Sequence, residues 1–192
     1  MAARGDLKRP ASPSALGGRA IGRRVGRVTA PRLRQWNNPP AMSTTAPDRP
    51  QAQPRSAYPV FRHITSRWMD NDVYGHINNV VYYSYFDTAV NGHLIDAGGL
   101  DIEAGTTIGL VIETHCNYFA PLAFPQTIDA GLRVAHLGRS SVRYEVGLFA
   151  QGEPLSAAAG HFVHVYVDRA SRRPVPLPSA LLAALQPLTL AA

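Results

Sequence analysis

The chain has 192 residues, enough for one compact domain with a hydrophobic core but too few for two large ones. Its formal net charge of +6 is unevenly distributed, because residues 1–57 carry eleven Lys or Arg against two acids and residues 58–192 carry eight Arg against eleven acids. The mildly acidic body argues against a nucleic-acid-binding domain, and the single cysteine, Cys116, excludes an intramolecular disulfide. No apolar run reaches the about 18 to 20 residues that cross a bilayer, and no secretory signal is present, so we expect no membrane span and a cytoplasmic protein.

Residues 1–57 form a tail that is rich in Arg, Pro, Ala, Ser and Gly and shows no helix or strand periodicity. Such a composition cannot bury enough apolar area to offset the entropy of ordering, so we predict that the tail is disordered. It is compatible with a nucleic-acid-binding arm, an organelle transit peptide or residues upstream of a true start at Met42. We favour a tail without functional importance, followed by one domain over residues 58–186.

The composition changes at Tyr58, where aromatic and β-branched residues become frequent. Residues 58–68 are typical of a strand, and residues 69–76 form an irregular polar stretch. Residues 77–97 are apolar nearly all round and end at Gly98-Gly99. This pattern predicts a long helix that is buried on nearly all sides.

Four further strands and a short helix complete the predicted domain. The strands are expected at 107–119, 126–137, 141–150 and 155–167, and they should form one antiparallel, meander-like sheet. A C-terminal helix over 178–188, begun by Pro178-Ser179, should cover an edge or an end of the sheet. A single long apolar helix among five strands predicts an α+β fold in which a curved antiparallel sheet wraps around the helix.

The polar stretch before the long helix is the part of the chain that best suits chemistry. The N–H groups at a helix N-terminus lack intrahelical partners and carry positive potential, so a thioester carbonyl oxygen placed there would be polarised. A carboxylate just upstream, Asp70 or Asp72, would then attack or activate water, and Gly75 would let the backbone approach a ligand closely. Asp and Asn residues ahead of a helix are also ordinary caps and turn formers, and spacing alone does not separate the two acids.

The same stretch resembles the signature of a known family. The matching residues are Asp70-x-Asp72-x-x-Gly75-His76-x-Asn78-Asn79-x-x-Tyr82 and Tyr85-Phe86-Asp87, then Asn117-Tyr118-Phe119-Ala120-Pro121, Gly138-Arg139-Ser140-Ser141, His164-Val165-Tyr166-Val167-Asp168 and Arg173-Pro174. Together they are similar to the motifs of the 4-hydroxybenzoyl-CoA thioesterase-like family of acyl-CoA thioester hydrolases. The resemblance implies a five-stranded hotdog fold, subunits that pair as homodimers or homotetramers, and active sites at subunit boundaries.

The resemblance also implies roles for individual residues. Asp72, the second acid of the pair, matches the nucleophile or general base, and the backbone N–H of Asn79 matches the group that polarises the thioester. His76 would orient water or touch the substrate carbonyl, or would instead bond a neighbouring loop carbonyl. Asn78 is typical of a helix cap. We also expect Asn78 and Gly75 to lie near the substrate.

Three further residues match a ligand-binding strand connection. Arg139, Ser140 and Ser141 correspond to residues that often line the pantetheine or phosphate end of CoA in the family, and arginine suits phosphates through its planar fork. The same residues would also make an ordinary turn. Tyr82 belongs to an aromatic cluster expected in the core and at subunit contacts, and we include its ring at the acyl pocket.

We predict an acyl-CoA thioesterase, which hydrolyses an acyl-CoA or a related acyl thioester to free acid and thiol without a cofactor. Asp87 and Glu113 are second-choice acids. The remaining histidines show no metal-ligand spacing, and no metal is expected. Two other functions stay open: a non-catalytic acyl-thioester-binding hotdog protein, and a hotdog hydratase or dehydratase that moves a proton with a His and an acid.

Overall fold

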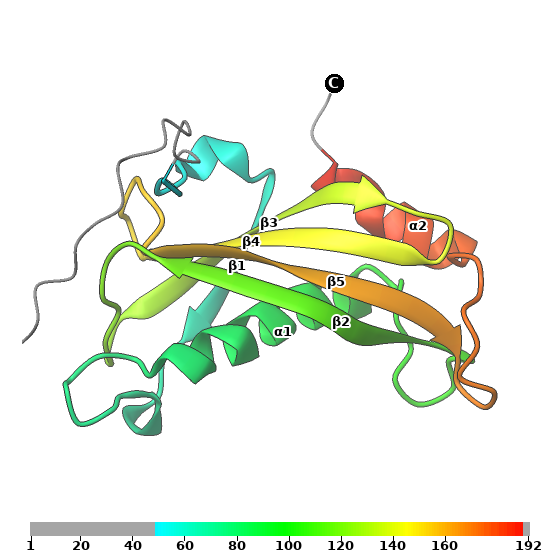
Figure 1. Cartoon of the computed structure of the whole chain (residues 1–192), viewed down its shortest axis with the longest axis horizontal. Coiled ribbons are helices and arrows are strands. Elements are labelled where there is room, and N and C mark those ends of the chain that lie inside the picture. Colours follow the sequence, from blue (N-terminus) through cyan, green and yellow to red (C-terminus); the bar gives the residue numbers. More distant parts are fainter. Residues whose placement is uncertain (1–48, 190–192) are drawn as a thin grey trace, which may run out of the picture. The chain divides into compact units, whose positions relative to one another are not determined.

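The computed structural model describes residues 49–189, so most of the predicted tail, with the proposed start at Met42, lies outside the described residues. The elements in chain order are η1 (Arg55–Ala57), β1 (Val60–Thr65), η2 (Trp68–Asp70), α1 (Asn79–Asp96), β2 (Thr107–Tyr118), β3 (Thr127–Leu137), β4 (Ser141–Ala150), β5 (Ala158–Asp168), α2 (Ser179–Leu185) and η3 (Gln186–Leu188), where η marks a short 3₁₀-helix. The predicted succession of a strand, a long helix, four strands and a short helix is confirmed (Figure 1).

The five strands form one antiparallel sheet in the order β1-β3-β4-β5-β2. β3, β4 and β5 follow one another as a meander, as predicted, but β2 pairs with β5 and not with β3. The meander prediction is wrong for β2 because the chain passes through α1 from one edge of the sheet to the other before β2 begins. β2 is interrupted by a register shift between Val111 and Glu113.

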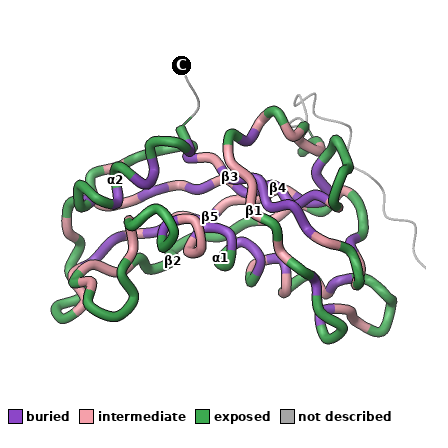
Figure 2. The backbone as a smooth tube through the Cα atoms, turned by 180° about the vertical axis from the view of Figure 1, so that it is seen from behind, coloured by how far each residue is buried: buried purple, intermediate pink, exposed green. Residues whose placement is uncertain are grey.

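α1 packs against one face of the sheet, which curves around it (Figure 1 and Figure 2). The buried side of the helix includes Phe86, Ala89 and Leu94, and it shares one core cluster with side chains of the sheet such as Val146 and Phe162. The α+β arrangement of a curved antiparallel sheet around a long helix is therefore confirmed.

The other side of α1 faces away from the sheet, and there Val80 and Ile95 are 64% and 41% exposed. The prediction of a helix buried on nearly all sides is wrong for a single chain, because the sheet covers only one side of it. The helix also begins later than predicted, at Asn79, because the side chain of Asn78 accepts the Val80 N–H at 3.1 Å and caps the first turn.

The segment before β1 is fastened to the opposite face of the sheet, which we call the outer face. The Gln53 N–H donates to Ser156 Oγ at 2.9 Å, and the Ser156 N–H donates to the Gln53 carbonyl at 2.9 Å. The Arg55 guanidinium donates to the buried carboxylate of Asp129 at 2.7 Å. This segment belongs to the folded domain, so the predicted end of the tail at residue 57 is wrong. Composition alone does not predict that Arg55 pairs with Asp129, which lies on β3 and is far away in the sequence.

α2 and η3 close the core at the end of the sheet where α1 ends. Leu181 and Leu185 are buried in the same core cluster as the inner side of α1. His93 Nε2, near the end of α1, lies 2.9 Å from the Ala184 carbonyl oxygen. The predicted C-terminal helix is confirmed. None of the helices within residues 49–189 is long and apolar enough to cross a membrane.

Arg55→Gln should lower the free energy of unfolding by about 2 kcal/mol, because it leaves the buried Asp129 carboxylate with His63 as its remaining side-chain partner. Burial by itself raises the pKa of Asp129, but hydrogen bonds from Arg55 and His63 outweigh it and hold that pKa below its ordinary value. The carboxylate therefore stabilises the fold above the pKa of an unfolded Asp, about 3.9, and this stabilisation is lost as the pH falls through the lower folded-state pKa.

Urea unfolding at neutral and at acidic pH measures this contribution. The matched control is Arg62→Gln, because the Asp96 partner of Arg62 is exposed and such surface pairs contribute at most about 1 kcal/mol. Equal losses of stability in the two variants would contradict the role assigned to Arg55.

Candidate active site

The polar stretch between β1 and α1 folds back on itself as a short loop. Asn71 and Ile77 pair across the loop. The Asp72 N–H donates to the His76 carbonyl at 2.8 Å, and the Gly75 N–H donates to the Asp72 carbonyl at 3.1 Å. Gly75 has a φ of 81°, which favours glycine because it lacks a Cβ. The loop holds Asp72 next to the start of α1.

Asp70 is a buried acid with both carboxylate oxygens in use. It is 1% exposed and accepts the Arg67 backbone N–H at 2.7 Å, the Arg67 guanidinium at 2.9 and 3.0 Å and the Tyr85 hydroxyl at 2.7 Å. Burial raises the pKa of Asp70, but the hydrogen bonds from Arg67 and Tyr85 outweigh it and hold the pKa below its ordinary value. These contacts favour a supporting role for Asp70.

Asp72 has the opposite surroundings. One carboxylate oxygen accepts the Tyr74 N–H at 2.8 Å, and the other has no hydrogen-bond partner among residues 49–189. The side chain borders a shallow hollow of about 390 Å³, which we call the Asp72 hollow. The other residues that line it are His76, Ile77, Asn79, Tyr82 and Tyr118 to Pro121. Of the two acids that spacing could not separate, Asp72 is the one open to a ligand.

The first turn of α1 supplies the second feature of this hollow. The Asn78 side chain accepts the Val80 N–H, and the Asn78 carbonyl accepts the Val81 N–H at 2.9 Å, so Asn78 caps the helix. The Asn79 N–H has no acceptor among residues 49–189, and Asn79 borders the hollow. A backbone donor at the positive end of a helix can polarise a carbonyl oxygen and stabilise the negative charge that develops on it.

The end of β2 forms the opposite wall of the hollow. The Tyr118 hydroxyl donates to the Asn79 carbonyl at 3.1 Å, and its ring meets the Tyr82 ring edge to face with centroids 5.0 Å apart. Burial raises the pKa of both tyrosines, so their hydroxyl groups stay protonated at neutral pH. The sequence pattern alone does not place the Asn117–Pro121 motif in the site, because only the topology brings this strand end to the helix start.

The remaining loop residues frame the hollow. His76 is exposed with its side chain at the rim, and Tyr82 is buried beneath it. Gly75 lines a neighbouring hollow of about 450 Å³ together with Trp68, and Asp72 borders both hollows. Among the residues predicted for the site, the structure thus brings together Asp72, His76, Asn79 and Tyr82, with Gly75 and Asn78 beside them.

Arg139, Ser140 and Ser141 do not reach the Asp72 hollow within one chain. Ser141 pairs opposite Val165 of β5, whereas Tyr118, in the wall of the hollow, pairs near the other end of β5. The β3–β4 hairpin and the loop before α1 lie at opposite ends of the sheet (Figure 1). β3 and β4 carry the hairpin away from the helix start of the same chain, and the contact of these three residues with the substrate stays a prediction.

The second-choice acids also lie apart from the hollow. Asp87 is on the side of α1 that faces away from the sheet, and partial burial raises its pKa. Glu113 is on the outer face, where a hydrogen bond from His161 at 2.8 Å lowers its pKa. Within residues 49–189, no three His, Cys, Asp or Glu side chains converge as a metal site requires.

Comparisons with known proteins give one family. The model of the thioesterase-like superfamily matches residues 66–185. The PA5185 protein of Pseudomonas aeruginosa has a solved structure that is 56% identical, with a TM-score of 0.72 and coverage of 74% of this chain and 99% of that chain. No curated protein matches the chain.

Two further solved structures are similar over most of their length. The PA2801 protein of Pseudomonas aeruginosa is 30% identical, with a TM-score of 0.59 and coverage of 70% of this chain and 98% of that chain. A thioesterase from Thermus thermophilus, in a crystal structure with coenzyme A and zinc, is 31% identical, with a TM-score of 0.55 and coverage of 68% of this chain and 94% of that chain.

Proposed function

Because the chain belongs to the thioesterase-like superfamily and is a thioester hydrolase, we propose that it hydrolyses an acyl-CoA to free acid and thiol at the Asp72 hollow. The main support is one juxtaposition: a carboxylate with an open oxygen, on Asp72, and an unpartnered backbone donor, on Asn79, border the same hollow. The Thermus thermophilus thioesterase was crystallised with coenzyme A, which supports CoA as the thiol carrier.

The proposed reaction uses these two groups together. The thioester carbonyl oxygen lies at the Asn79 N–H, which stabilises the negative charge that forms when the carbonyl carbon is attacked. Asp72 either attacks that carbon directly or takes the proton of a water molecule that attacks it, and His76 at the rim orients the water. The C–S bond then breaks, and the thiol, with a pKa of about 8.5, leaves readily as thiolate. If Asp72 attacks directly, the product of this step is an acyl–Asp72 anhydride, which water then hydrolyses to the free acid and the Asp72 carboxylate.

We also propose that two chains pair along β2. This strand is an outer edge of the sheet, and Leu110, Val111 and Ile112 on it are 37%, 46% and 64% exposed. An edge strand with exposed apolar side chains is prone to pair with another strand. Antiparallel pairing of two copies of β2 about a two-fold axis would join the two sheets into one, giving a homodimer or a tetramer built from it.

Such pairing gives Arg139, Ser140 and Ser141 a place near the substrate. In an antiparallel pair, the start of the partner's β2 lies beside the end of β2 that carries Tyr118. Ser141 and the start of β2 both pair with the last residues of β5, so they share one end of a subunit. The hairpin of the partner subunit would therefore come to the same end of the joined sheet as the Asp72 hollow.

Asp72→Asn should lower kcat for thiol release from acyl-CoA by at least about 100-fold, because it removes the base or nucleophile. The free energy of unfolding should change by less than about 0.5 kcal/mol, since an Asn side-chain oxygen can still accept the Tyr74 N–H. A panel of short, long and aromatic acyl-CoAs, followed with a thiol reagent, measures the effect and identifies the acyl group.

Asp87→Asn is the competing variant in this assay and should keep the wild-type kcat. Loss of thiol release in Asp87→Asn with activity retained in Asp72→Asn would move the reacting carboxylate to α1. A folded wild-type protein that releases no thiol from any member of the panel would overturn the proposed function.

Asn79→Pro tests the backbone donor by itself. Asn79 is the first residue of α1, where proline fits helix geometry, and Asn78 before it has the extended conformation, φ −59° and ψ 139°, that a following proline requires. We expect kcat to fall by about 100- to 1,000-fold because the N–H is removed, with little change in Tm. Asn79→Ala changes the side chain but keeps the N–H, and it should retain most of the wild-type kcat. Equal activity of the two variants would show that the N–H does not take part.

Ile112→Lys tests the pairing along β2. The chain has a mass of 20.8 kDa, so light scattering after size exclusion should give twice or four times this mass for the wild type. A lysine at this exposed edge position should shift the mass toward that of one chain, because like charges would meet at the two-fold axis. Leu182→Lys, at an exposed position of α2, is the control and should leave the mass unchanged. A single-chain mass for the wild type would contradict the pairing.

A further inference from the structure

The hydroxyl group of Tyr118 reaches from the sheet to the first residue of α1. It donates to the Asn79 carbonyl at 3.1 Å, and the Tyr118 ring meets the Tyr82 ring with centroids 5.0 Å apart. Asn79 and Tyr82 are three residues apart in the helix, so they lie on the same side of its first turn. One side chain of β2 therefore contacts this turn at two points. The proposed hydrolysis leaves its hydroxyl group without a role.

The end of β2 that carries Tyr118 is fixed to the sheet. Tyr118 pairs with Ala158 of β5. The N–H groups of the next two residues, Phe119 and Ala120, both donate to the Ala157 carbonyl, at 2.8 and 3.0 Å. Ala157 is buried, so water has little access to this anchor. Tyr118 therefore extends toward α1 from a firmly held part of the sheet.

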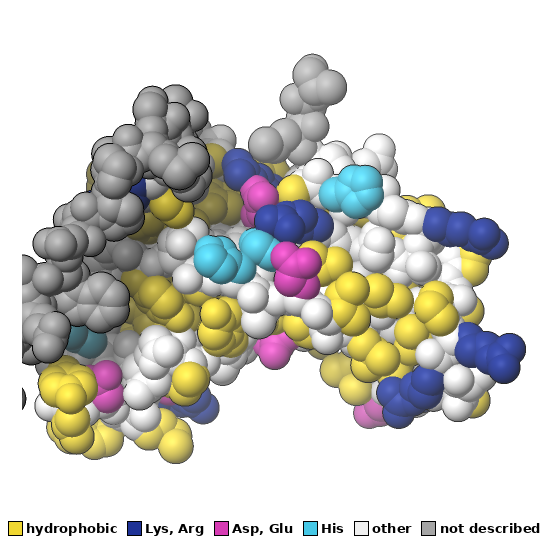
Figure 3. Space-filling view, viewed as in Figure 1, with side chains coloured by type: hydrophobic (Ala, Val, Ile, Leu, Met, Phe, Trp, Pro, Cys, Tyr) yellow, Lys and Arg dark blue, Asp and Glu magenta, His cyan; other side chains and the backbone are white. Residues whose placement is uncertain are grey.

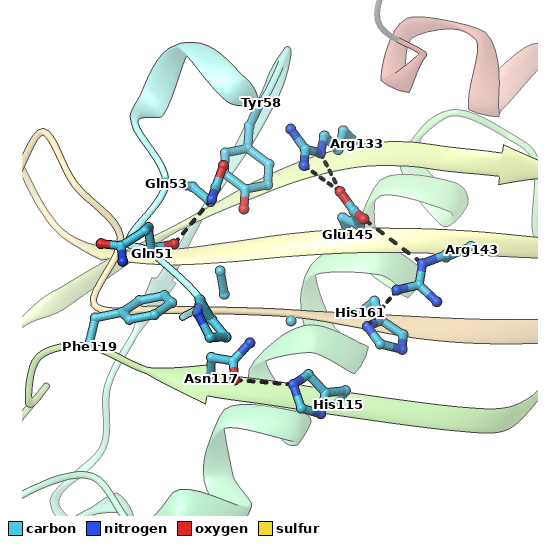
Figure 4. Close-up of a pocket in the computed structure, with 13 residues that line it drawn as sticks. Gln51, Gln53, Tyr58, His115, Asn117, Phe119, Arg133, Arg143, Glu145 and His161 are labelled. Atoms are coloured by element: carbon cyan, nitrogen blue, oxygen red, sulfur yellow. Dashed lines mark hydrogen bonds and ion pairs between the residues drawn. The ribbon is translucent and has the colours of Figure 1, made fainter. Parts of the chain in front are cut away.

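The residues on either side of Tyr118 point to the other face of the sheet. Imidazole, guanidinium and carboxylate side chains gather at the centre of the outer face (Figure 3). Asn117 and Phe119 line a cavity on this face together with some of these groups (Figure 4). Because side chains alternate between the two faces of a strand, Tyr118 points to the inner face, where α1 lies. The strand itself sets the direction of the Tyr118 hydroxyl group.

The first turn of α1 depends on contacts from outside the helix, because the first N–H groups of a helix lack intrahelical partners. The Asn78 side chain supplies one contact, to the Val80 N–H. The Asn78 N–H supplies a second, since it donates to the Asp70 carbonyl at 2.9 Å. These contacts fix the residue that precedes Asn79. Among residues 49–189, Tyr118 provides the side-chain hydrogen bond to the carbonyl of Asn79, on its other side.

We propose that Tyr118 is a positioning residue for the reaction at the Asp72 hollow, because its hydroxyl group holds Asn79 with the N–H directed at the thioester carbonyl oxygen. A donor that is already in place stabilises the developing negative charge without having to reorient during the reaction. Loss of the hydroxyl group therefore lowers kcat and not the affinity for substrate. Tyr118 acts through Asn79, since its own proton is donated to the Asn79 carbonyl. This inference rests on the proposed hydrolysis.

Tyr118→Phe removes the hydroxyl group and keeps the ring that packs on Tyr82. We expect kcat for thiol release to fall about five- to tenfold, the size of one neutral hydrogen bond, with KM unchanged. Thr88→Val is the matched control and should keep the wild-type kcat. The Thr88 hydroxyl also donates to a carbonyl of α1, that of Ser84 at 2.8 Å, but neither residue lines the hollow. An unchanged kcat in Tyr118→Phe, or a rise of KM in its place, would overturn the inference.

A double-mutant cycle distinguishes a positioning role from a purely structural one. If Tyr118 acts through the Asn79 N–H, Tyr118→Phe should change kcat by less than about twofold once Asn79→Pro has removed that N–H. In the Asn79→Ala background, which keeps the N–H, the fall of about five- to tenfold should persist. Equal falls in the wild-type and Asn79→Pro backgrounds would show that Tyr118 acts independently of the N–H, and this result would overturn the inference.

Amide hydrogen exchange measured by NMR separates this inference from the proposed hydrolysis, because it requires no turnover. In Tyr118→Phe, the Val80 and Val81 N–H groups should exchange at least about threefold faster, since the first turn of α1 opens more often, while amides in the middle of α1 keep their rates. Faster exchange in a protein that hydrolyses no thioester would support the hold on the first turn and remove the proposed reaction. Hydrolysis with unchanged exchange and unchanged kcat in Tyr118→Phe would keep the reaction and overturn the inference.

Discussion

A buried carboxylate fixes the geometry on which the candidate site depends. A fully buried charge is tolerated only when hydrogen bonds and opposite charge surround it, and Asp70 finds these partners on both sides of the loop. Arg67 comes from the turn before it and Tyr85 from the helix after it, while the Asp70 carbonyl accepts the Asn78 N–H at 2.9 Å. A shift of the start of α1 relative to β1 would take the Tyr85 hydroxyl from this buried charge and break the hydrogen bond between the Asn78 N–H and the Asp70 carbonyl. Asp72 is therefore held between two fixed points.

The order of the elements could be predicted from the sequence because hydrophobic periodicity and turn residues are local signals. The pairing of β2 with β5 could not, because alternation shows which side chains share a face but not which strands are neighbours. The anchoring of Arg55 by Asp129 is also a long-range contact, and it made the predicted tail too long. In the site, Asp70 and Asp72 are the same residue type, and only the fold distinguishes them, through their burial and their hydrogen-bond partners. The sequence motif identified the loop, while the opposing wall at Tyr118 depended on topology.

The two faces of the sheet carry different kinds of side chain. Along β4, Tyr144 and Val146 point into the core around α1, while Arg143 and Glu145 alternate with them on the outer face. One strand thus stabilises the core with one set of side chains and forms ion pairs on the outer face with the other. The segment before β1 lies on the outer face, where Gln51 and Gln53 line the same cavity as these charged groups and Asn117 of β2 (Figure 4).

The N–H donor at the start of α1 belongs to the backbone of Asn79 and not to its side chain. The donor is therefore independent of the side chain that shapes the surface at this position. Substitution at position 79 alters the surface that borders the Asp72 hollow, yet the same N–H remains in the same place as long as Asn78 caps the helix. Under the proposed mechanism, a substitution at this position would therefore change the surface next to the acyl group without removing the polarising N–H. Variation at residue 79 would then alter the preference for the acyl substrate and leave the reaction mechanism unchanged.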